Sequence, residues 1–598
     1  MKRLLICGIA TLVGACTATT SVNRVAKEPE RQVNSALRPA LAHINKAKSL
    51  KKFGEWDSVV VECSEALKKE PRLVEAWQGR GEAYVFKAEY DKAISDCDKA
   101  IEYGPEFVDG WVTRAQAYAF KSEWLKAVAD CNQALEVAPK SAEAWAARAV
   151  AAAGMDDFKM AMEDCEKALE FGPRLAEAWM ARARALCCKA DFKAALEDCH
   201  KAVEFGPENA KAWLARARAY CGLDEFDNAV ADCDKALQFG PKQADTWATR
   251  AKAYCGKDEF DKAIADCNNA LKFGPKYVDG WVTRAKAHCG KQQFDKALAD
   301  ANKAVQLGPR QAESWIARAD AQFGKGAFDK AAADCQKALE IVPASADALT
   351  TRGRAFLYLG ELEKARDDLD KALEFDAKNV TAWNGRAVVF RNLGEFENSI
   401  RDYTKAIELD PTFVRGWSNR GRTYRDMGEF DKALADYDKA LQLDAGNAVN
   451  VEGRAAVQRA RKNWEGVLPD VERALALAKE DVECKIYAHL DRAAAYVGLD
   501  KLDDARRDAQ SAYDLSKAHL KKNPSDGWAH FAAACTCAWQ AELTADPESQ
   551  EGIRVTAFTH LEKAVKTGSI SKVHLNTDLD ASLLRADERF RRVLDLAK

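Results

Sequence analysis

Residues 210–243 read AKAWLARARAYCGLDEFDNAVADCDKALQFGPKQ and contain two runs of apolar residues at helical spacing. Steps of four and three residues place side chains on one face of a helix. The residues with this spacing are Trp213, Ala217 and Tyr220 in the first run, and Ala229, Cys233 and Ala236 in the second. Gly240 and Pro241 follow, and they should end the second helix, since glycine permits a left-handed cap and proline stops propagation. The stretch therefore predicts a helical hairpin.

This hairpin unit recurs along the chain with a step of 34 residues. Tryptophan takes the position of Trp213 in most copies: Trp77, Trp111, Trp145, Trp179, Trp247, Trp281, Trp315, Trp383 and Trp417. No insertion or deletion interrupts the count over residues 40–447, which gives twelve units in register. One hairpin cannot bury its apolar face alone, so successive hairpins are expected to stack on one another.

The unit resembles the tetratricopeptide repeat, whose pattern is W-x2-L-G-x2-Y, then A-x3-F, then P. Trp213, Tyr220, Ala229 and Pro241 stand at matching positions. The resemblance implies an all-α fold, an α-solenoid in which about 14–15 helical hairpins form a right-handed superhelix with a C-terminal capping segment. It also implies that the first helices line a concave groove and that this groove binds proteins or peptides.

The N-terminus reads as an export signal. A positively charged start precedes an apolar run over residues 4–15, which is too short to cross a bilayer as a helix. Residues 13–16, VGAC, resemble the bacterial lipobox, which implies cleavage before Cys16 and lipidation of Cys16. The alternative is an ordinary secretory signal with a coincidental cysteine. We expect a lipid-anchored membrane protein on the periplasmic side of the bacterial cell envelope, or a cytoplasmic protein if the signal is not used.

The period loosens after residue 447, and two short helices with Asp580 and Asp587 as candidate N-caps are expected to close the array. Five segments are therefore predicted. They are a signal peptide at 1–15, a flexible polar tether at 16–39, twelve in-register units at 40–447, degenerate hairpins at 448–566 and a helical cap at 567–598.

Two charged rows accompany the repeat. From the second unit onward the seventh position is arginine and the twenty-third is aspartate. Examples are Arg216 with Asp232 and Arg250 with Asp266. A half-buried guanidinium needs a carboxylate partner, so we predict a structural Arg–Asp pair repeated along the stack, within a hairpin or between neighbours. The alternative is a row of arginines that contacts a ligand.

Charge and motifs argue against several classes of protein. The 90 Lys and Arg residues nearly balance the 93 Asp and Glu residues, so no strongly basic face for nucleic acid is expected. The 18 cysteines form no CxxC pair, and the 8 histidines show no metal-ligand spacing. Motifs for phosphate loops, dinucleotides and hydrolase nucleophiles are also missing from the sequence. We therefore expect no catalytic residue, cofactor or metal site, and no enzyme.

The later units carry basic and amide side chains at and near the first-helix positions that usually contact ligands in this family. The candidate binding residues are Arg354, Arg391, Arg415, Arg422, Arg425, Asn384 and Asn419. They suggest an extended peptide or protein partner with an acidic segment, held by charge-assisted hydrogen bonds. The alternative is that these arginines are solvated at the surface or paired with neighbouring aspartates.

The predicted function is a non-catalytic scaffold that mediates protein–protein or peptide binding through its concave groove. The alternative is a non-catalytic targeting arm or regulator of a separate enzyme system, such as a kinase, a glycosyltransferase or a cell-wall hydrolase. Both interpretations place the function in a binding surface rather than in a reaction.

Overall fold

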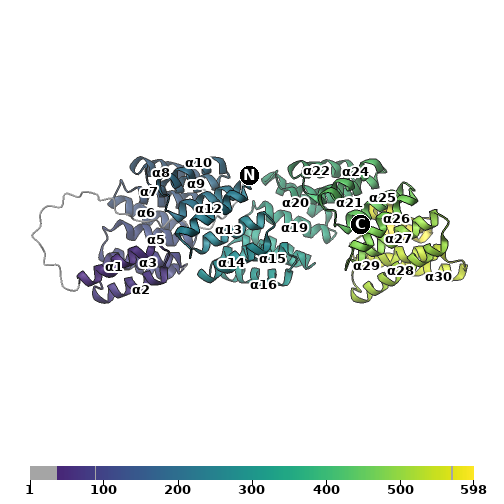
Figure 1. Cartoon of the computed structure of the whole chain (residues 1–598), viewed down its shortest axis with the longest axis horizontal. Coiled ribbons are helices and arrows are strands. Elements are labelled where there is room, and N and C mark those ends of the chain that lie inside the picture. Colours follow the sequence, from purple (N-terminus) through teal and green to yellow (C-terminus); the bar gives the residue numbers. More distant parts are fainter. Residues whose placement is uncertain (1–36, 88, 156, 568–569, 598) are drawn as a thin grey trace, which may run out of the picture. The chain divides into compact units, whose positions relative to one another are not determined.

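The computed structural model describes residues 37–597 except 88, 156, 568 and 569. The lipidation site expected at Cys16 lies outside these residues. The described part contains α-helices, one 3-10 helix and no strand, which confirms the all-α prediction. Within each of two compact units, consecutive helices pair into hairpins that pack against their neighbours (Figure 1). The chain divides into two compact units, which are described separately: an N-terminal unit up to Gly326 with residues 340–343, and a C-terminal unit formed by the rest.

The N-terminal unit contains regular hairpins in which, apart from α1 with its 15 residues, the first helix has 13 residues and the second has 14. Its helices are α1 (Leu37–Lys51), α2 (Trp56–Lys69), α3 (Val74–Phe86), α4 (Tyr90–Tyr103), α5 (Val108–Phe120), α6 (Trp124–Val137), α7 (Ala142–Gly154), α8 (Phe158–Phe171), α9 (Ala176–Cys188), α10 (Phe192–Phe205), α11 (Ala210–Gly222), α12 (Phe226–Phe239), α13 (Ala244–Gly256), α14 (Phe260–Phe273), α15 (Val278–Gly290), α16 (Phe294–Leu307) and α17 (Ala312–Gly324). The division between the units falls close to α18 (Phe328–Ile341).

The C-terminal unit continues the hairpins and ends in a short helical segment. Its helices are α19 (Ala346–Tyr358), α20 (Leu362–Phe375), α21 (Val380–Asn392), α22 (Phe396–Leu409), α23 (Val414–Asp426), α24 (Phe430–Leu443), α25 (Ala448–Ala460), α26 (Trp464–Leu477), α27 (Val482–Gly498), α28 (Leu502–Lys522), α29 (Gly527–Leu543), α30 (Pro547–Lys566), α31 (Lys572–Thr577), the 3-10 helix η1 (Ala581–Leu584) and α32 (Glu588–Leu596). No helix among the described residues is long and apolar enough to span a bilayer.

The left-handed residue of the hairpin lies in the turn between its two helices rather than at its end. Asp224 has φ 61° in this turn, and Gly360 takes the equivalent place in its hairpin with φ 74°. The predicted left-handed cap at Gly240 is wrong, because its φ is −145°. Its N–H still bonds the carbonyl of Ala236. Glycine at this position serves close packing instead, since a Cβ on the equivalent Gly172 would lie 2.9 Å from the Cβ of Ala142.

Small residues and tryptophan hold neighbouring hairpins together. Ala217, Ala229 and Ala236 are completely buried, and their size lets the helices approach closely. The indole N–H of Trp213 donates to the carbonyl of Pro207, 2.8 Å away in the preceding loop. The recurring tryptophan and proline therefore belong to one contact, which explains why they share a period.

The last residue of several first helices is a glycine that lies beneath an aromatic ring. A Cβ on Gly256, for example, would come within 2.3 Å of the ring of Phe226 in the preceding hairpin. The same arrangement occurs at Gly222, Gly290 and Gly324. Where the position is aromatic the two rings stack, as Phe120 does on Tyr90 at 5.1 Å. In these hairpins the aromatic residue therefore packs on the next hairpin against either a glycine or a second ring.

Replacing Gly256 with alanine should destabilise the N-terminal unit by about 1–3 kcal/mol, because the added methyl group overpacks against Phe226. The gain in helix propensity, about 1 kcal/mol, opposes this loss only in part. Gly552→Ala is the control, because a Cβ there meets no atom within 4 Å and should be neutral or stabilising. Denaturant unfolding of both variants would measure the difference, and equal stabilities would contradict the packing argument.

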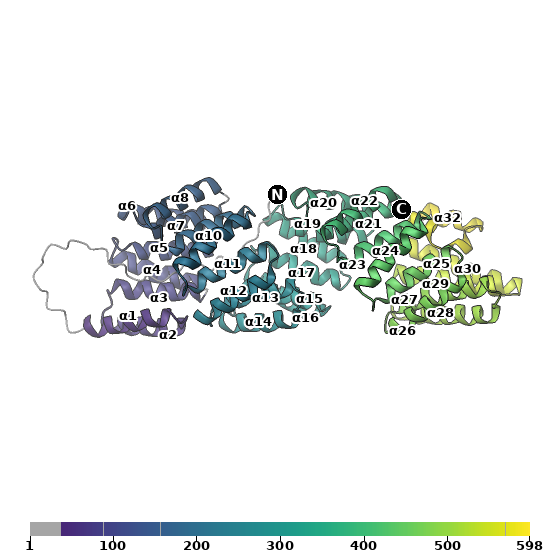
Figure 2. The ribbon, with the colours of Figure 1, turned by 45° about the horizontal axis from the view of Figure 1, so that its top comes forward.

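The C-terminal segment, residues 570–597, packs on the last hairpin. α32 lies against α30 (Figure 2), and η1 packs against α29. Its buried apolar residues join the core around Phe531: Ile570, Leu575, Leu584, Phe590 and Val593. Asp587 caps α32 by accepting from the N–H of Arg589. The carboxylate of Asp580 does not cap η1, contrary to the sequence-based expectation, because two buried donors described below hold it.

Candidate functional site

The arginine at the seventh repeat position bridges three helices. Arg250 of α13 forms a bidentate pair with Asp266 of α14, with Nε–Oδ2 and Nη2–Oδ1 distances of 2.7 and 2.8 Å. Its Nη1 reaches Asp234 in α12 of the preceding hairpin. The guanidinium also lies 4.8 Å from the ring centroid of Trp247. Hydrogen bonding to Asp266 raises the pKa of Arg250, so the side chain stays charged.

The pairing therefore lies within a hairpin, and Arg216 repeats it with Asp232 at 2.7 and 2.8 Å. Further bidentate pairs are Arg80–Asp96, Arg114–Asp130, Arg148–Asp164, Arg182–Asp198, Arg284–Asp300, Arg352–Asp368, Arg386–Asp402, Arg420–Asp436, Arg454–Asp470 and Arg492–Asp508. Because these guanidinium groups are engaged in the stack, the geometry favours a structural role over ligand contact.

In the N-terminal unit, hairpins far apart in sequence contact one another. Lys242 pairs with Glu55 at 2.6 Å, and a pocket of about 160 Å³ lies beside them. Aromatic side chains line much of this pocket: Trp56, Phe86, Tyr90, Phe120, Phe273 and Tyr277. The buried Nζ of Lys211 lies 4.3 Å from the ring centroid of Phe86, and burial lowers the pKa of Lys211. Several apolar residues of this unit are thus used in internal packing.

The C-terminal unit brings three of the predicted binding arginines together. Arg391 of α21 and Arg425 of α23 both bond Asp426, with Nε–Oδ2 and Nη2–Oδ1 distances of 2.9 and 3.0 Å. Arg422 lies beside them, and its buried Nε atom meets no hydrogen-bond partner among the described residues. We call Arg391, Arg422 and Arg425 the arginine cluster.

The arginine cluster carries more positive charge than its neighbours neutralise. The positive charge of Arg391, then burial and Arg425, lower the pKa of Arg422. Burial opposes the charge on Asp426, but the three arginines hold its pKa at about 2. Burial and the nearby Asp491 raise the pKa of Glu452, which favours its neutral form. One carboxylate therefore faces three guanidinium groups, and an additional anionic group would be stabilised here.

The other predicted binding residues lie around this cluster in different settings. Asn419 donates to the side chain of Asn384 at 3.0 Å, which joins α23 to α21. Arg415 is exposed in the first turn of α23, two helical turns before Arg422. The aliphatic part of Arg354 packs beside Gly385 of α21.

Sequence reasoning missed a second buried charge network beside the cluster. Arg459 of α25 donates to Asp491 of α27 at 2.8 Å and to Asp580 of the C-terminal segment at 2.7 Å. The indole N–H of Trp539 donates to the same oxygen of Asp580. A signal was present, because Arg391, Arg425 and Arg459 occupy the twelfth position of three successive units.

The C-terminal segment also reaches the arginine cluster. Val573 of α31 lies 3.4 Å from where a Cβ on Gly394 would sit, at the turn between α21 and α22. Burial and the positive charges of Arg422 and Arg391 lower the pKa of His574, which therefore stays neutral near the cluster. The segment thus lies beside the turn after α21 and near the arginine cluster, as well as on the last hairpin.

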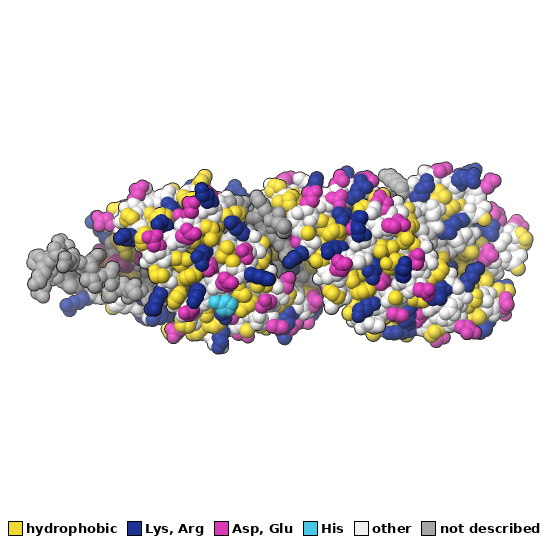
Figure 3. Space-filling view, turned by 90° about the horizontal axis from the view of Figure 1, so that it is seen from above, with side chains coloured by type: hydrophobic (Ala, Val, Ile, Leu, Met, Phe, Trp, Pro, Cys, Tyr) yellow, Lys and Arg dark blue, Asp and Glu magenta, His cyan; other side chains and the backbone are white. Residues whose placement is uncertain are grey.

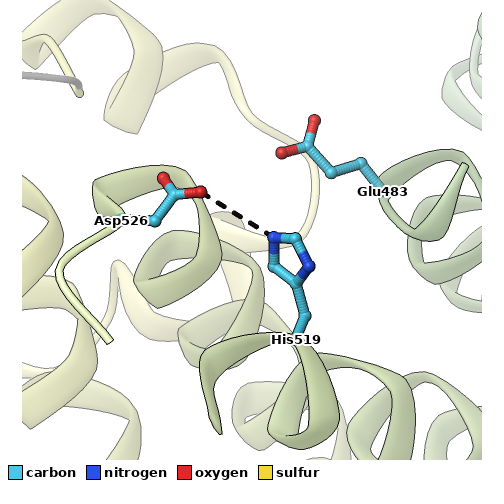
Figure 4. Close-up of side chains that lie close together, drawn as sticks. All are labelled: Glu483, His519 and Asp526. Carbon is cyan, nitrogen blue, oxygen red and sulfur yellow. Dashed lines mark ion pairs between the residues drawn. The ribbon is translucent and has the colours of Figure 1, made fainter. Parts of the chain in front are cut away.

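One group of described side chains has the composition of a metal site. Glu483, His519 and Asp526 place one possible ligand atom each within 4.8 Å of one another (Figure 4). The face shown in Figure 3 has basic and acidic side chains interspersed, as expected from the balanced composition.

Comparison with known proteins agrees with the repeat found in the sequence. Family models described as "Tetratricopeptide repeat" match residues 74–107, 142–173, 180–244, 282–346, 346–379, 380–413 and 414–447. No curated protein matches the chain in sequence. Among solved structures, the crystal structure of the APC/C hetero-tetramer Cut9-Hcn1 is similar at 14% identity and a TM-score of 0.46, covering 76% of this chain and 98% of that chain. This likeness is too distant to bear on function.

Proposed function

We propose that this chain, which carries tetratricopeptide repeats, is a non-catalytic scaffold that binds an extended acidic segment of a partner protein at the arginine cluster. The observation that carries the proposal is the buried Nε of Arg422, which has no hydrogen-bond partner among the described residues. A buried donor without a partner costs about 1–3 kcal/mol, and more when charged. A carboxylate of the partner would supply both the acceptor and the missing negative charge.

The geometry suits a peptide better than a small free anion. The cluster lies on α21 and α23, which are first helices of adjacent hairpins, so a segment that crosses both can meet several side chains in turn. Arg391 and Arg425 are already oriented by Asp426, which reduces the entropy lost when a ligand binds. The paired amides of Asn384 and Asn419 lie on the same two helices.

Replacing Arg422 with glutamine should weaken binding of an acidic peptide by about tenfold to 100-fold, since a charge-assisted hydrogen bond is worth about 1.5–3 kcal/mol. Fluorescence anisotropy with a labelled oligoglutamate peptide would measure the affinity, with the corresponding oligoglutamine peptide as the uncharged probe. Arg415→Gln is the matched control, because it removes the same charge from an exposed position of the same helix. If the two substitutions weaken binding equally, the peptide responds only to the overall positive charge, and the proposal of a binding site at the arginine cluster is wrong.

The cellular setting of the scaffold is proposed from the sequence alone. A lipid on Cys16 and a tether between Cys16 and the start of α1 at Leu37 would hold the repeats at the periplasmic face of a bacterial membrane. Mass spectrometry of the mature N-terminus tests the anchor, because cleavage before Cys16 and acylation change both sequence and mass. Crosslinking and capture from detergent-solubilised cells separates a scaffold from the targeting arm of an enzyme system. An enzyme recovered in fixed proportion would favour the arm.

A further inference from the structure

Three helices of the C-terminal unit converge at Glu483, His519 and Asp526. Glu483 lies in the first turn of α27, His519 lies in the last turn of α28, and Asp526 is the N-cap of α29. The antiparallel pairing of α27 with α28 brings the start of one beside the end of the other, and the short loop after α28 returns Asp526 to the same place. The three side chains point toward a common space (Figure 4).

The two carboxylate oxygens of Asp526 have different neighbours. Its Oδ1 accepts from the N–H of Trp528 at 2.9 Å and so caps α29. Its Oδ2 faces the Nε2 atom of His519 at 3.8 Å. That distance is too long for a hydrogen bond, and the buried Nε2 meets no hydrogen-bond partner among the described residues. Buried imidazole nitrogens normally have a partner, so this atom needs one.

The surroundings favour a cation as that partner. One carboxylate oxygen of Glu483 and one of Asp526 lie within 4.8 Å of each other and of a ring nitrogen of His519. These carboxylates therefore create a negative potential around the nitrogen of His519. A positive ion between them would relieve the repulsion and coordinate the nitrogen at the same time.

We propose that Glu483, His519 and Asp526 bind one divalent transition-metal ion, with Zn²⁺ preferred, through His519 Nε2, Asp526 Oδ2 and a carboxylate oxygen of Glu483. Imidazole nitrogen and carboxylate oxygen both bind zinc, and three protein ligands leave the fourth tetrahedral position to water. Imidazole disfavours Mg²⁺ and Ca²⁺, which prefer oxygen ligands. This site departs from the expectation of no metal site, because its residues come from two hairpins and share no motif.

Only small movements are needed to form the site. Zinc bonds of about 2.0–2.1 Å place neighbouring ligand atoms about 3.3 Å apart in a tetrahedron, so the observed 3.8 Å must shorten slightly. Glu483 is exposed and can turn toward the ion without disturbing the core. The bound ion would tie the hairpin α27–α28 to α29, and so stabilise the end of the array.

The proposal is tested by titrating the metal-free full chain with Zn²⁺ and with Co²⁺. We expect one site in the wild-type chain that Mg²⁺ and Ca²⁺ do not occupy, with Zn²⁺ raising the unfolding temperature. His519→Gln and Glu483→Gln should weaken binding by at least tenfold, since even outer-shell substitutions cost about 10–100-fold. Asp526→Asn keeps a good N-cap while removing the charge, so it should lose affinity and stay folded.

His200→Gln is the matched control, because His200 is exposed on α10 and its Nδ1 lies 2.8 Å from the carbonyl oxygen of Leu196. The spectrum of bound Co²⁺ reports whether thiolates are ligands, which separates this site from the cysteines. The proposal is overturned if Zn²⁺ affinity is unchanged in His519→Gln and Asp526→Asn. It is also overturned if thiolate absorption shows that the ion sits on cysteines instead.

Discussion

Replacing Asp580 with alanine should lower the free energy of unfolding of the C-terminal unit by about 3–5 kcal/mol, the usual cost of breaking a buried ion pair from one side. Asp580 is 4% exposed and accepts from both Arg459 and Trp539 at 2.7 Å. The substitution would leave the indole N–H without its acceptor and Arg459 with Asp491 alone. The C-terminal segment should then detach from the first helices more often than in the wild-type chain.

Amide hydrogen exchange resolves this effect by helix, which matters because long repeat arrays do not unfold in a two-state manner. Protection should fall in α29, α31 and η1 and stay unchanged in the N-terminal unit. Asp587→Ala is the control, since it removes an aspartate from the same segment that caps α32 and pairs with the partly exposed Arg589, at about 1–2 kcal/mol. If the two substitutions cost the same, the buried network does not hold the segment in place.

Replacing Arg250 with methionine should lower the free energy of unfolding of the N-terminal unit by about 3–5 kcal/mol, because it leaves Asp266 buried without its bidentate partner. Asp266 is 5% exposed, so water compensates poorly. The loss of stability should affect two hairpins, since Arg250 also contacts Asp234 of the preceding hairpin. Denaturant unfolding combined with hydrogen exchange across α12, α13 and α14 would measure it.

The double variant Arg250→Met with Asp266→Leu separates the ion pair from simple loss of packing. Buried ion pairs replaced on both sides by apolar residues are often neutral, so the double variant should recover most of the stability. Asp234→Ala supplies a second comparison, because this partner is half exposed and its loss should cost at most about 1 kcal/mol. A double variant that is no more stable than Arg250→Met would mean that the pair is not the main interaction.

The local features of the fold could be predicted because the sequence repeats them. The 34-residue period predicted the hairpins, and the need of a half-buried arginine for a carboxylate predicted the partner of Arg250. The sequence left open whether this pair forms within a hairpin or between neighbouring hairpins, because that depends on how each helix is rotated. The predicted role of Gly240 was wrong for a related reason. A glycine can be needed either for a left-handed backbone or for close packing, and only the structure distinguishes the two.

The candidate site was predicted only in part. The basic residues of α21 and α23 were identified from their repeat positions, but periodicity relates each hairpin only to its neighbours. It carries no information about Arg459 and Asp580, which are 121 residues apart. The site at His519 was missed because its residues belong to the irregular hairpins, where no repeated position marks them.

The ion pair between Glu55 and Lys242 has a consequence for how this gene can change. Repeat proteins usually tolerate duplication or loss of a unit, because each unit touches only its neighbours. Here two residues 187 positions apart must meet. A unit added or deleted between them would shift one partner along the array and separate the pair. Duplication should therefore be tolerated less well within this interval than beyond it.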